Sequence, residues 1–423
     1  MKSLTQKMNL LLKTTPNIHQ SKVSITGSKS ETNRLLLLQA LYPNISLENI
    51  SNSDDSDVMV KAIKDSQQTN SDCQVIDIHH AGTAMRFLTA YFAVQEGKEV
   101  VLTGSSRMKE RPITILVEAL RQLGAQISYT EHDGYPPLKI VGKKLTQNKV
   151  TLSADVSSQF ISALLLIAPK LDNGLHLTLE GFITSAPYIK MTLEILNSIG
   201  IQTSFENNVI KVDPQSTISN SKFIIESDWS SASYYYSIVA LSPLNTEITL
   251  SNYKKNSLQG DAVLKEIYEN FGVETTHMTA GIKIKKIKYT VQSLRLDLNA
   301  TPDIAQTLVV TCFALGVACY LSGLHTLKIK ETDRLEALKT ELTRLGALVI
   351  TSDSTIKLGA STRIHPNKKI KTYQDHRMAM AFAPLALKTP IEIQNAEVVS
   401  KSYPSFWNDL KNIGFQISEQ KAL

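Results

Sequence analysis

A repeat of 73 residues constrains the fold of this chain more than any other feature of its sequence. Short polar or glycine-containing segments open apolar stretches at residues 84, 157, 230, 303 and 376, each 73 residues after the one before. An earlier segment, Gly27-Ser28-Lys29-Ser30, opens a sixth stretch after a shorter interval. Repeats of this length exceed the units of helical solenoids and suit a unit of several helices and strands. We therefore predict six repeated αβ units.

A second marker recurs at the ends of the predicted helices. The pattern Leu-x-x-Leu-Gly occurs at Leu120–Gly124 and Leu342–Gly346, and looser versions end at Gly200, Gly272 and Gly414. Glycine after the last turn is the usual left-handed helix cap. Strand-like stretches follow, such as Ala125–Tyr129. Each repeat is thus predicted to run helix, strand, helix, glycine cap and strand pair, with a degenerate first copy that has Ser66 near the expected glycine.

The length of the chain predicts two domains. Its 423 residues exceed what one hydrophobic core usually serves. Six repeats divide into two sets of three, and the break between the third and fourth repeats falls near Glu226–Asp228. No Gly/Ser-rich linker marks this break, so we expect short, direct crossings between the domains.

Composition narrows the class of protein. Hydrophobic residues make up 42% and charged residues 20%, as in ordinary globular proteins. The net charge of +6 is mild and spread along the chain, so it does not indicate nucleic-acid binding and fits small anionic substrates equally well. Three cysteines without a CxxC pair argue against a disulfide framework or a zinc site and fit a reducing cytoplasm.

Two apolar segments are relevant to targeting. Met8–Leu12 is too short for the apolar part of a signal peptide. Thr307–Leu324 carries no charge and is about as long as a short membrane span. Its polar Thr307, Thr311, Tyr320 and Ser322, and its place in the repeat, favour a buried helix instead. We expect no membrane association.

The predicted helix starts also suit anion binding. Free N–H groups and the positive end of the helix dipole attract phosphates and carboxylates. Plain N-capping by Ser, Thr and Asp explains any single start equally well. Six starts in register favour function because cations lie near them in sequence: Lys29, Arg34, Arg111, Lys330, Arg334, Arg377 and Lys401.

Specific motifs then resemble one family. Gly27-Ser-Lys-Ser-Glu-Thr-Asn-Arg34, Ala81-Gly-Thr-Ala-Met-Arg86 and Arg107-Met-Lys-Glu-Arg-Pro112 resemble segments of 5-enolpyruvylshikimate-3-phosphate synthases. Further similar segments follow in family order: Ser157-Ser-Gln159, Pro187-Tyr188, Gln259-Gly-Asp261, Pro302-Asp303, Lys330-Glu-Thr-Asp-Arg334, Asp375-His-Arg-Met-Ala-Met380 and Lys401. Together they cover roughly residues 22–404.

The resemblance implies an α/β fold of two similar domains, each of three βαβαββ repeats around a pseudo-threefold axis. It implies residues 22–226 for one domain, residues 1–21 and 227–423 for the other, and an active site in the cleft between them. The implied reaction transfers the enolpyruvyl group of phosphoenolpyruvate to the 5-hydroxyl of shikimate 3-phosphate and releases phosphate. This is a step of the shikimate pathway to chorismate and the aromatic amino acids. A cytoplasmic monomer without metal or cofactor is expected, as is inhibition by glyphosate.

The same resemblance assigns roles to residues. Asp303 is expected to act as base toward the attacking hydroxyl, and Glu331 and Lys29 are the candidates for proton transfer at the methylene carbon. Phosphoenolpyruvate is expected to contact Lys29, Gly82, Arg111, Gln159, Arg334, Arg377 and Lys401. Shikimate 3-phosphate is expected to contact Lys29, Ser30, Arg34, Ser157, Ser158, Gln159, Tyr188, Asp303, Thr326 and Lys330.

The chain departs from the family pattern at four positions. His80 stands where the family often has Asn, and Phe87 where it often has Pro. Ala186 replaces a usual Arg, and Thr326 replaces a usual Asn that contacts the shikimate hydroxyls.

Local alternatives exist for two motifs. Lys330–Arg334 also fits a solvated helix start with i,i+4 pairing. Asp375-His376-Arg377 also fits an N-cap with a surface ion pair.

Three other functions are alternatives for the whole chain. UDP-N-acetylglucosamine enolpyruvyl transferases resemble it in fold and donor, but that family uses a loop cysteine and the stretch Arg107–Pro112 has none. An RNA-processing protein of similar repeats would need a catalytic His and a concentrated basic face, and neither is evident. A non-enzymatic repeat protein would not need charged residues at the same phase of each repeat.

Overall fold

The computed structural model describes residues 8–14, 18, 21–68, 73–155, 157–289, 293–361 and 363–420. The chain divides into two compact units. The central unit is Gly27–Ile225, and the discontinuous unit combines Met1–Thr26 with Glu226–Leu423.

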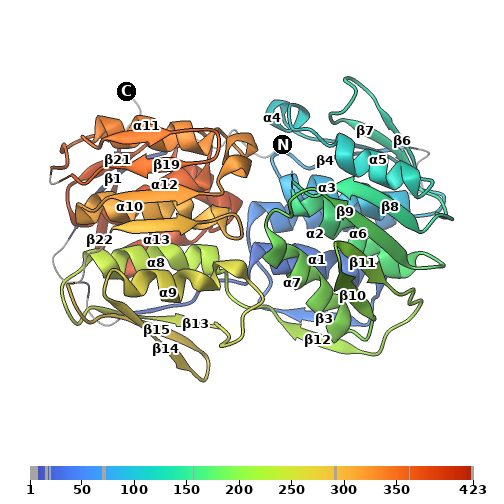
Figure 1. Cartoon of the computed structure of the whole chain (residues 1–423), viewed down its shortest axis with the longest axis horizontal. Helices are drawn as coiled ribbons and strands as arrows, with labels where there is room; N and C mark the ends of the chain where they lie inside the picture. Colours follow the sequence, from blue (N-terminus) through green and yellow to red (C-terminus); the bar gives the residue numbers. More distant parts are fainter. Residues whose placement is uncertain are drawn as a thin grey trace. The chain divides into compact units, whose positions relative to one another are not determined.

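The central unit, blue to green in Figure 1, contains three repeats. The first repeat comprises α1 (Lys29–Leu41), β3 (Ile45–Glu48) and α2 (Asp54–Gln68). The second comprises β4 (Gln74–Asp77), α3 (Gly82–Ala93), β5 (Glu99–Thr103), α4 (Ser106–Lys109), α5 (Thr114–Gln122), β6 (Gln126–Tyr129) and β7 (Leu138–Val141). The third comprises β8 (Lys149–Ser153), α6 (Ser158–Ile167), η1 (Ala168–Lys170), β9 (Leu175–Glu180), α7 (Ala186–Ser198), β10 (Thr203–Glu206) and β11 (Val209–Val212), and β12 (Ser221–Ile224) follows.

The discontinuous unit contains the other three repeats and is yellow-green to red in Figure 1, apart from the blue strands at the start of the chain. It begins with β1 (Asn9–Thr14) and β2 (Ser21–Val23) and resumes with α8 (Trp229–Leu241), β13 (Glu247–Ser251), η2 (Gly260–Val263), α9 (Leu264–Glu269), β14 (Val273–Met278) and β15 (Gly281–Lys286). The fifth repeat comprises β16 (Leu294–Asp297), η3 (Pro302–Ile304), α10 (Ala305–Leu315), β17 (Cys319–Ser322), η4 (His325–Ile329), α11 (Arg334–Arg344), β18 (Val349–Thr351) and β19 (Ile356–Leu358). The sixth comprises β20 (Lys369–Ile370), α12 (His376–Phe382), η5 (Ala383–Leu387), β21 (Ile391–Ile393), η6 (Ala396–Lys401), α13 (Phe406–Asn412) and β22 (Phe415–Gln420).

One strand order recurs in the four-stranded sheets. In β4-β5-β7-β6, the first two strands are parallel and β7 lies antiparallel to both β5 and β6. The sheets β8-β9-β11-β10 and β16-β17-β19-β18 have the same order. The sixth repeat completes its sheet, β20-β21-β1-β22, with the strand β1 from the start of the chain. The predicted sequence of helices and strands within a repeat is confirmed.

Two strands are exchanged where the chain passes between the units. β2 precedes α1 in sequence but pairs in parallel with β13 of the discontinuous unit. β12 precedes α8 but pairs in parallel with β3 of the central unit. Each crossing therefore falls between a strand and the helix that follows it. At the first crossing a side chain on Gly27 would overlap the carbonyl oxygen of Asn49, so this position requires glycine.

The predicted helix starts and glycine caps are confirmed. Three of the predicted polar segments supply side-chain caps: Ser28 to α1, Ser157 to α6 and Asp375 to α12. Asp228 caps α8, while η3 leads directly into α10. The five predicted cap glycines, Gly124, Gly200, Gly272, Gly346 and Gly414, have φ between 72° and 113°. Only glycine adopts this left-handed region without steric cost.

The uncharged run Thr307–Leu324 differs from its prediction. It was expected to form one buried helix, but α10 ends at Leu315 and Gly316 follows with φ 77°. The rest of the run contains strand β17, in which buried residues alternate with half-buried ones. Over the described residues, no helix has the length and apolar character needed to cross a membrane.

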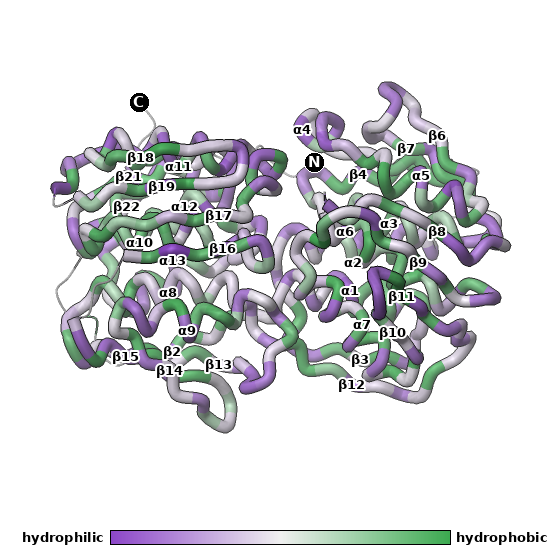
Figure 2. Tube along the Cα trace, in the orientation of Figure 1, coloured by the Kyte–Doolittle hydropathy of each residue, from purple (hydrophilic) through white to green (hydrophobic). Residues whose placement is uncertain are grey.

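Each unit has its own hydrophobic core. In the central unit, α3 is buried on every side, and it packs against α1 and α6. In the discontinuous unit, α8 is buried along its whole length, and α10 packs against both α8 and α12. Hydrophobic residues, green in Figure 2, run through these helices and the strands around them. Because these helices are held by packing on all sides, the polar residues at their N-terminal ends are held in fixed positions.

Candidate active site

Arg334 is the centre of an ion-pair cluster in the discontinuous unit. It is 1% exposed and contacts three carboxylates. Its Nε lies 2.6 Å from Asp375 Oδ2, its Nη1 lies 2.9 Å from Asp303 Oδ1, and its Nη2 lies 2.8 Å from Glu331 Oε2. Burial opposes the charge of Arg334, but the carboxylates of Asp375, Glu331 and Asp303 outweigh it and raise the pKa. The guanidinium is thus permanently charged and fixed in orientation.

Asp303 lies among three cations. Besides Arg334, its carboxylate faces Arg377 Nη2 at 3.1 Å and Lys330 Nζ at 3.7 Å. Burial alone would raise the pKa of Asp303, but Arg377, Lys330 and Arg334 together hold it well below its usual range. Asp303 is therefore ionised, as a proton acceptor must be.

Glu331 and Lys401 form a second pair in the same cluster. Lys401 ends η6, is 9% exposed and lies 2.8 Å from Glu331 Oε1. With Arg334 on its other oxygen, Glu331 contacts two cations, which stabilise the carboxylate form.

Both local alternatives for these motifs are wrong in part. The segment Lys330–Arg334 is not a solvated helix start, since Arg334 is buried at the first position of α11. Asp375 is the expected N-cap and accepts the backbone N–H of Arg377 at 2.7 Å. Its ion pair with Arg334, however, is fully buried rather than on the surface.

A hydroxyl and a further carboxylate lie behind Arg377. Ser230, at the start of α8, accepts a hydrogen bond from Arg377 Nη2 at 3.3 Å and donates one to Asp261 Oδ2. Asp261 was predicted only as part of a family motif, and no role was assigned to Ser230 or Asp261. The sequence repeat could have identified Ser230 as a site residue. It occupies the position in its repeat that Asp303 and His376 occupy in the next two, each 73 residues further along the chain.

Thr326 occupies the position where the family usually has Asn. It lies on η4, which packs against η3 and so lies close to Asp303. Its Oγ1 is buried and has no hydrogen-bond partner among the residues that the structure describes.

Lys29 begins the site of the central unit. Its Nζ lies 3.2 Å from Asp55 Oδ2, and the Asp55 side chain is only 5% exposed. Asp55 lies in the first turn of α2 and was not predicted as a site residue. The sequence Asp54-Asp55-Ser56-Asp57 contains no feature that separates Asp55 from its neighbours, so only the fold identifies it.

Arg34 is a buried cation with neutral partners. Its Nε donates to Thr192 Oγ1 at 2.8 Å, and its Nη2 donates to Ser162 Oγ at 2.9 Å. Further bonds reach the backbone oxygens of Ser30 and Tyr188 at 2.8 and 3.2 Å. Burial lowers the pKa of Arg34 to about 10.

Two aromatic rings flank the same guanidinium. The Phe87 and Tyr188 ring centres lie 5.4 and 5.7 Å from its central carbon. Arg34 thus connects α1, α3, α6 and α7, and Phe87 is the residue that differs from the family pattern.

Gly82 and Arg111 are in close contact. A side chain on Gly82 would overlap the guanidinium of Arg111, so glycine leaves the room that Arg111 occupies. The buried Arg86 joins the two motifs, since its Nη1 donates to Gly82 O at 3.2 Å and its Nη2 to Pro112 O at 3.3 Å. The loop Arg107–Pro112 is thereby connected to the start of α3.

The start of α6 lies beside the start of α3. Ser157 caps α6, and Gln159 Nε2 donates to Thr83 Oγ1 at 3.3 Å. Ser158 is buried at the first helical position. At the start of α7, Ser185 has φ 55° and Ala186 is half-buried. The Ala186 side chain cannot supply the guanidinium that the family usually has at this position.

The predicted site residues thus fall into two groups. The central unit contains Lys29, Ser30, Arg34, Gly82, Arg111, Ser157, Ser158, Gln159 and Tyr188. The discontinuous unit contains Asp303, Thr326, Lys330, Glu331, Arg334, Arg377 and Lys401. In the described parts of the chain, no group of three or more His, Cys, Asp or Glu side chains is arranged to hold a metal ion.

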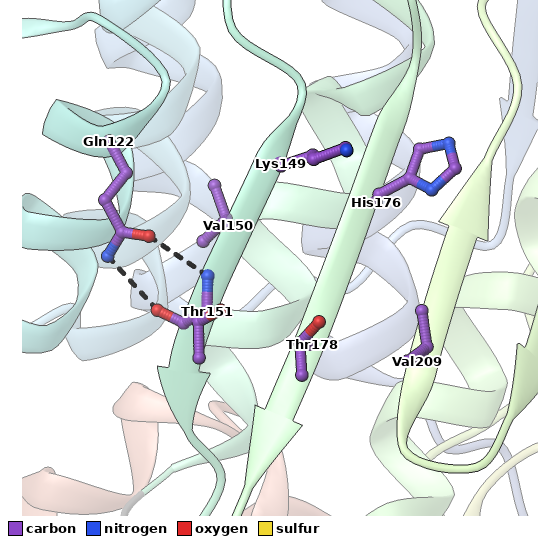
Figure 3. A pocket seen from close by; sticks show the side chains of 7 residues that line it. All are labelled: Gln122, Lys149, Val150, Thr151, His176, Thr178 and Val209. Atoms are coloured by element: carbon purple, nitrogen blue, oxygen red, sulfur yellow. Dashed lines mark hydrogen bonds between the residues drawn. The ribbon is translucent and has the colours of Figure 1, made fainter.

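A separate hollow of about 300 Å³ lies in the central unit at Gln122, Lys149, Val150, Thr151, His176, Thr178 and Val209. It contains none of the predicted site residues. Figure 3 shows the Gln122 amide bonded to the backbone of Thr151, at 3.0 Å to the N–H and 3.1 Å to the carbonyl oxygen. These bonds occupy backbone groups of the edge strand β8. The hollow thus belongs to a protected sheet edge.

Comparisons with known proteins identify the family. A sequence model of EPSP synthase (3-phosphoshikimate 1-carboxyvinyltransferase) matches residues 46–410. A 3-phosphoshikimate 1-carboxyvinyltransferase of Bacteroides fragilis strain YCH46 is 46% identical over 407 residues, which cover 95% of this chain and 97% of the relative. The chain belongs to the EPSP synthase family.

Less similar members of the EPSP synthase family support the same family assignment and fold. The 3-phosphoshikimate 1-carboxyvinyltransferase of Haemophilus influenzae strain Rd is 35% identical over 425 residues, covering 93% of this chain and 96% of the relative. An EPSP synthase structure from Acinetobacter baumannii has a TM-score of 0.80 at 20% identity and covers 98% of this chain and 100% of that one. That likeness concerns the fold, and it confirms the predicted fold class. The family match favours EPSP synthase over the three alternative functions.

Proposed function

We infer that this chain is a 3-phosphoshikimate 1-carboxyvinyltransferase (EC 2.5.1.19). It transfers the enolpyruvyl group of phosphoenolpyruvate to the 5-hydroxyl of shikimate 3-phosphate and releases phosphate. The reaction belongs to the shikimate pathway, which supplies chorismate and the aromatic amino acids. The observation that carries this conclusion is the 46% identity to a 3-phosphoshikimate 1-carboxyvinyltransferase over 95% of the chain.

The charge of the substrates explains the composition of the two residue groups. Both substrates carry a phosphate and a carboxylate, so their binding requires several fixed cations. We assign phosphoenolpyruvate to Lys29, Gly82, Arg111, Gln159, Arg334, Arg377 and Lys401. We assign shikimate 3-phosphate to Lys29, Ser30, Ser157, Ser158, Gln159, Tyr188, Asp303, Thr326 and Lys330. Arg34 belongs to the same set, but its four hydrogen bonds to protein support a role in holding Ser30 and Tyr188.

Asp303 is proposed to take the proton from the attacking hydroxyl. Without substrate, the cations around Asp303 make it a weak base, because they stabilise its ionised form. Bound phosphate and carboxylate groups would neutralise part of the charge of Arg377 and Lys330. The basicity of Asp303 would then rise toward the range in which proton transfer is efficient. Substrate binding thus activates the base.

Proton delivery to the methylene carbon has two candidates, Glu331 and Lys29. The carboxylate of Glu331 contacts Arg334 and Lys401, and both cations favour its unprotonated form. Lys29 carries protons that it can donate and is held at 3.2 Å from Asp55. We therefore propose Lys29 as the donor and Glu331 as a residue that stabilises positive charge developing near the carbon.

We further propose that residues 22–226 form one enolpyruvyl transferase domain and that residues 1–21 with 227–423 form the other, both acting on the same pair of substrates. The predicted cytoplasmic location is supported by three cysteines that are free in the structure. A monomer is proposed, and light scattering after gel filtration tests it.

The function is tested by phosphate release. Purified protein is incubated with phosphoenolpyruvate and shikimate 3-phosphate, and inorganic phosphate is measured over time. Release that requires both substrates is expected. A parallel reaction with UDP-N-acetylglucosamine in place of shikimate 3-phosphate is expected to give none. Absence of release with shikimate 3-phosphate, with or without added metal ion, contradicts the proposal.

A further inference from the structure

Asp261 is a buried carboxylate that the proposed reaction does not use. It lies in η2 and is 4% exposed. Its Oδ2 accepts the hydroxyl proton of Ser230. Its Oδ1 is buried and has no hydrogen-bond partner in the part of the chain that the structure describes. Burying a carboxylate costs free energy unless hydrogen bonds or nearby cations compensate for the lost hydration.

Ser230 connects this carboxylate to Arg377. A hydroxyl has a single proton, and Ser230 donates it to Asp261. The lone pairs of the same oxygen then face Arg377 Nη2, which donates to it at 3.3 Å. An ionised Asp261 therefore keeps Ser230 oriented as an acceptor for Arg377.

Arg377 in turn faces the proposed base. The nitrogen that contacts Ser230, Nη2, also lies 3.1 Å from Asp303 Oδ2. Arg377 Nε is buried and has no hydrogen-bond partner among the described residues. The contacts that orient this guanidinium are thus concentrated at Nη2, and Ser230 supplies one of them.

We propose that Asp261 is a positioning residue for enolpyruvyl transfer, which acts through the Ser230 hydroxyl to hold Arg377 against Asp303 and phosphoenolpyruvate. This inference rests on the proposed role of Arg377 in binding phosphoenolpyruvate. When Asp261 is protonated, Ser230 loses the acceptor that fixed its proton, and Arg377 loses a nearby negative charge. The orientation of Arg377 then becomes less defined, and binding of phosphoenolpyruvate weakens.

The charges around Asp261 set the pH at which this happens. Burial and the charge of Asp303 raise the pKa of Asp261 to about 7, against the hydrogen bond from Ser230 and the charge of Arg377, which lower it. Asp228, the cap of α8, adds to the upward shift. The adjacent helix α9 carries three charged residues, of which Lys265 and Glu266 form a pair with each other at 3.7 Å and Glu269 is the last residue of the helix. The contribution of Asp261 is therefore present above about pH 7 and lost below it.

The test compares kcat/KM for phosphoenolpyruvate in wild type and Asp261→Asn between pH 5.5 and 8.5, at saturating shikimate 3-phosphate. The ratio of the two values cancels the titration of the substrates, which is common to both enzymes. We expect a ratio of about 10- to 100-fold at pH 8.5, the usual effect of a hydrogen bond to a charged group. At pH 5.5 the ratio should fall to about 5-fold or less, because wild-type Asp261 is then mostly protonated. The change should appear mainly in KM.

Two further variants separate positioning from folding. Ser230→Ala removes the connection and should reproduce the pH-dependent ratio even where Asp261→Asn does not fold. Ser233→Ala removes a hydroxyl one turn later on α8, which bonds to Ser230 O and Thr307 Oγ1, and its ratio should stay constant with pH. A constant ratio for both Asp261→Asn and Ser230→Ala overturns the proposal. Failure of the proposed function is distinct, since the wild type would then release no phosphate at any pH.

Discussion

Asp303 Oδ2 lies 3.1 Å from Arg377 Nη2, and each residue stands at the start of the buried helix of its own repeat, α10 and α12. Ser230, at the start of α8, contacts the same guanidinium. The three repeats of the discontinuous unit thus bring one polar residue each to a common point. Each repeat contributes a buried helix whose first residues are polar. The repeated helices therefore place these polar residues next to one another and form a charged site.

Replacement of the proposed base tests this arrangement. Asp303→Asn keeps the size of the side chain but removes its basicity, and we expect kcat to fall by about 100- to 10,000-fold. Steady-state phosphate release measures turnover, and circular dichroism shows whether the variant is folded. Asp353→Asn is the control, because the Asp353 side chain is 93% exposed and forms a surface ion pair with Lys328. Wild-type turnover of Asp303→Asn at any pH would contradict the assignment.

Gly82→Ala tests the contact between α3 and Arg111. The added methyl group overlaps the Arg111 guanidinium, so Arg111 must move. Because Arg111 is proposed to bind phosphoenolpyruvate, displacing its guanidinium should weaken a hydrogen bond to a charged group, at a cost of about 1.5–3 kcal/mol, or roughly 10- to 150-fold in affinity. The KM for phosphoenolpyruvate should rise, and the inhibition constant of glyphosate, a longer ligand, should rise by more. Inhibition kinetics with glyphosate at fixed phosphoenolpyruvate measure both constants.

The control for this prediction is Gly359→Ala. A methyl group there meets Leu348 at an ordinary distance of 3.4 Å. Equal glyphosate sensitivity in wild type and Gly82→Ala would show that Arg111 moves without affecting the ligand.

Phe87→Leu tests the aromatic contact of Arg34. Loss of the ring removes a cation–π contact worth about 0.5–2 kcal/mol, and Arg34 should hold Ser30 and Tyr188 less firmly. We expect the KM for shikimate 3-phosphate to rise by about 3- to 30-fold, with a smaller change for phosphoenolpyruvate. Phe92→Leu, in the same helix, loses the same volume but contacts Tyr91 rather than Arg34. The two variants should therefore lose similar stability, while only the first changes the KM.

Lys286 makes stability depend on pH. It is 1% exposed, and its Nζ donates to the backbone oxygens of Ala240 and Phe271 at 2.9 and 2.5 Å. Burial, with a contribution from Lys388, lowers the pKa of Lys286 from 10.5 to about 8. Between these values the unfolded chain binds more protons than the folded one, so the free energy of unfolding rises with pH.

Urea unfolding at pH 7.5 and 9.5 measures this effect. Lys286 should add about 2 kcal/mol to the free energy of unfolding over this interval. Lys286→Met should reduce the rise by that amount, whereas Lys283→Met, on the same strand β15 but partly exposed, should not. The same pH dependence in wild type and Lys286→Met would show that Lys286 is not the group that titrates.

Several parts of the molecule followed from the sequence because they depend on local interactions. A helix start needs a capping side chain within three residues, and a helix end needs a glycine that adopts positive φ. Ser28, Asp375 and Gly346 satisfy these conditions without reference to the rest of the chain. The repeat of such signals predicted six αβ units, and the ordered motifs predicted the family.

Only the tertiary structure decided the relations between distant residues. The exchange of β2 and β12 depends on which sheet each strand completes, and no local signal distinguishes the two choices. The buried ion pair of Arg334 with Asp375, and the connection of Asp261 to Arg377 through Ser230, depend on distances between residues from different repeats. Charges interact according to their separation in space and the water around them, which the order of residues along the chain does not contain.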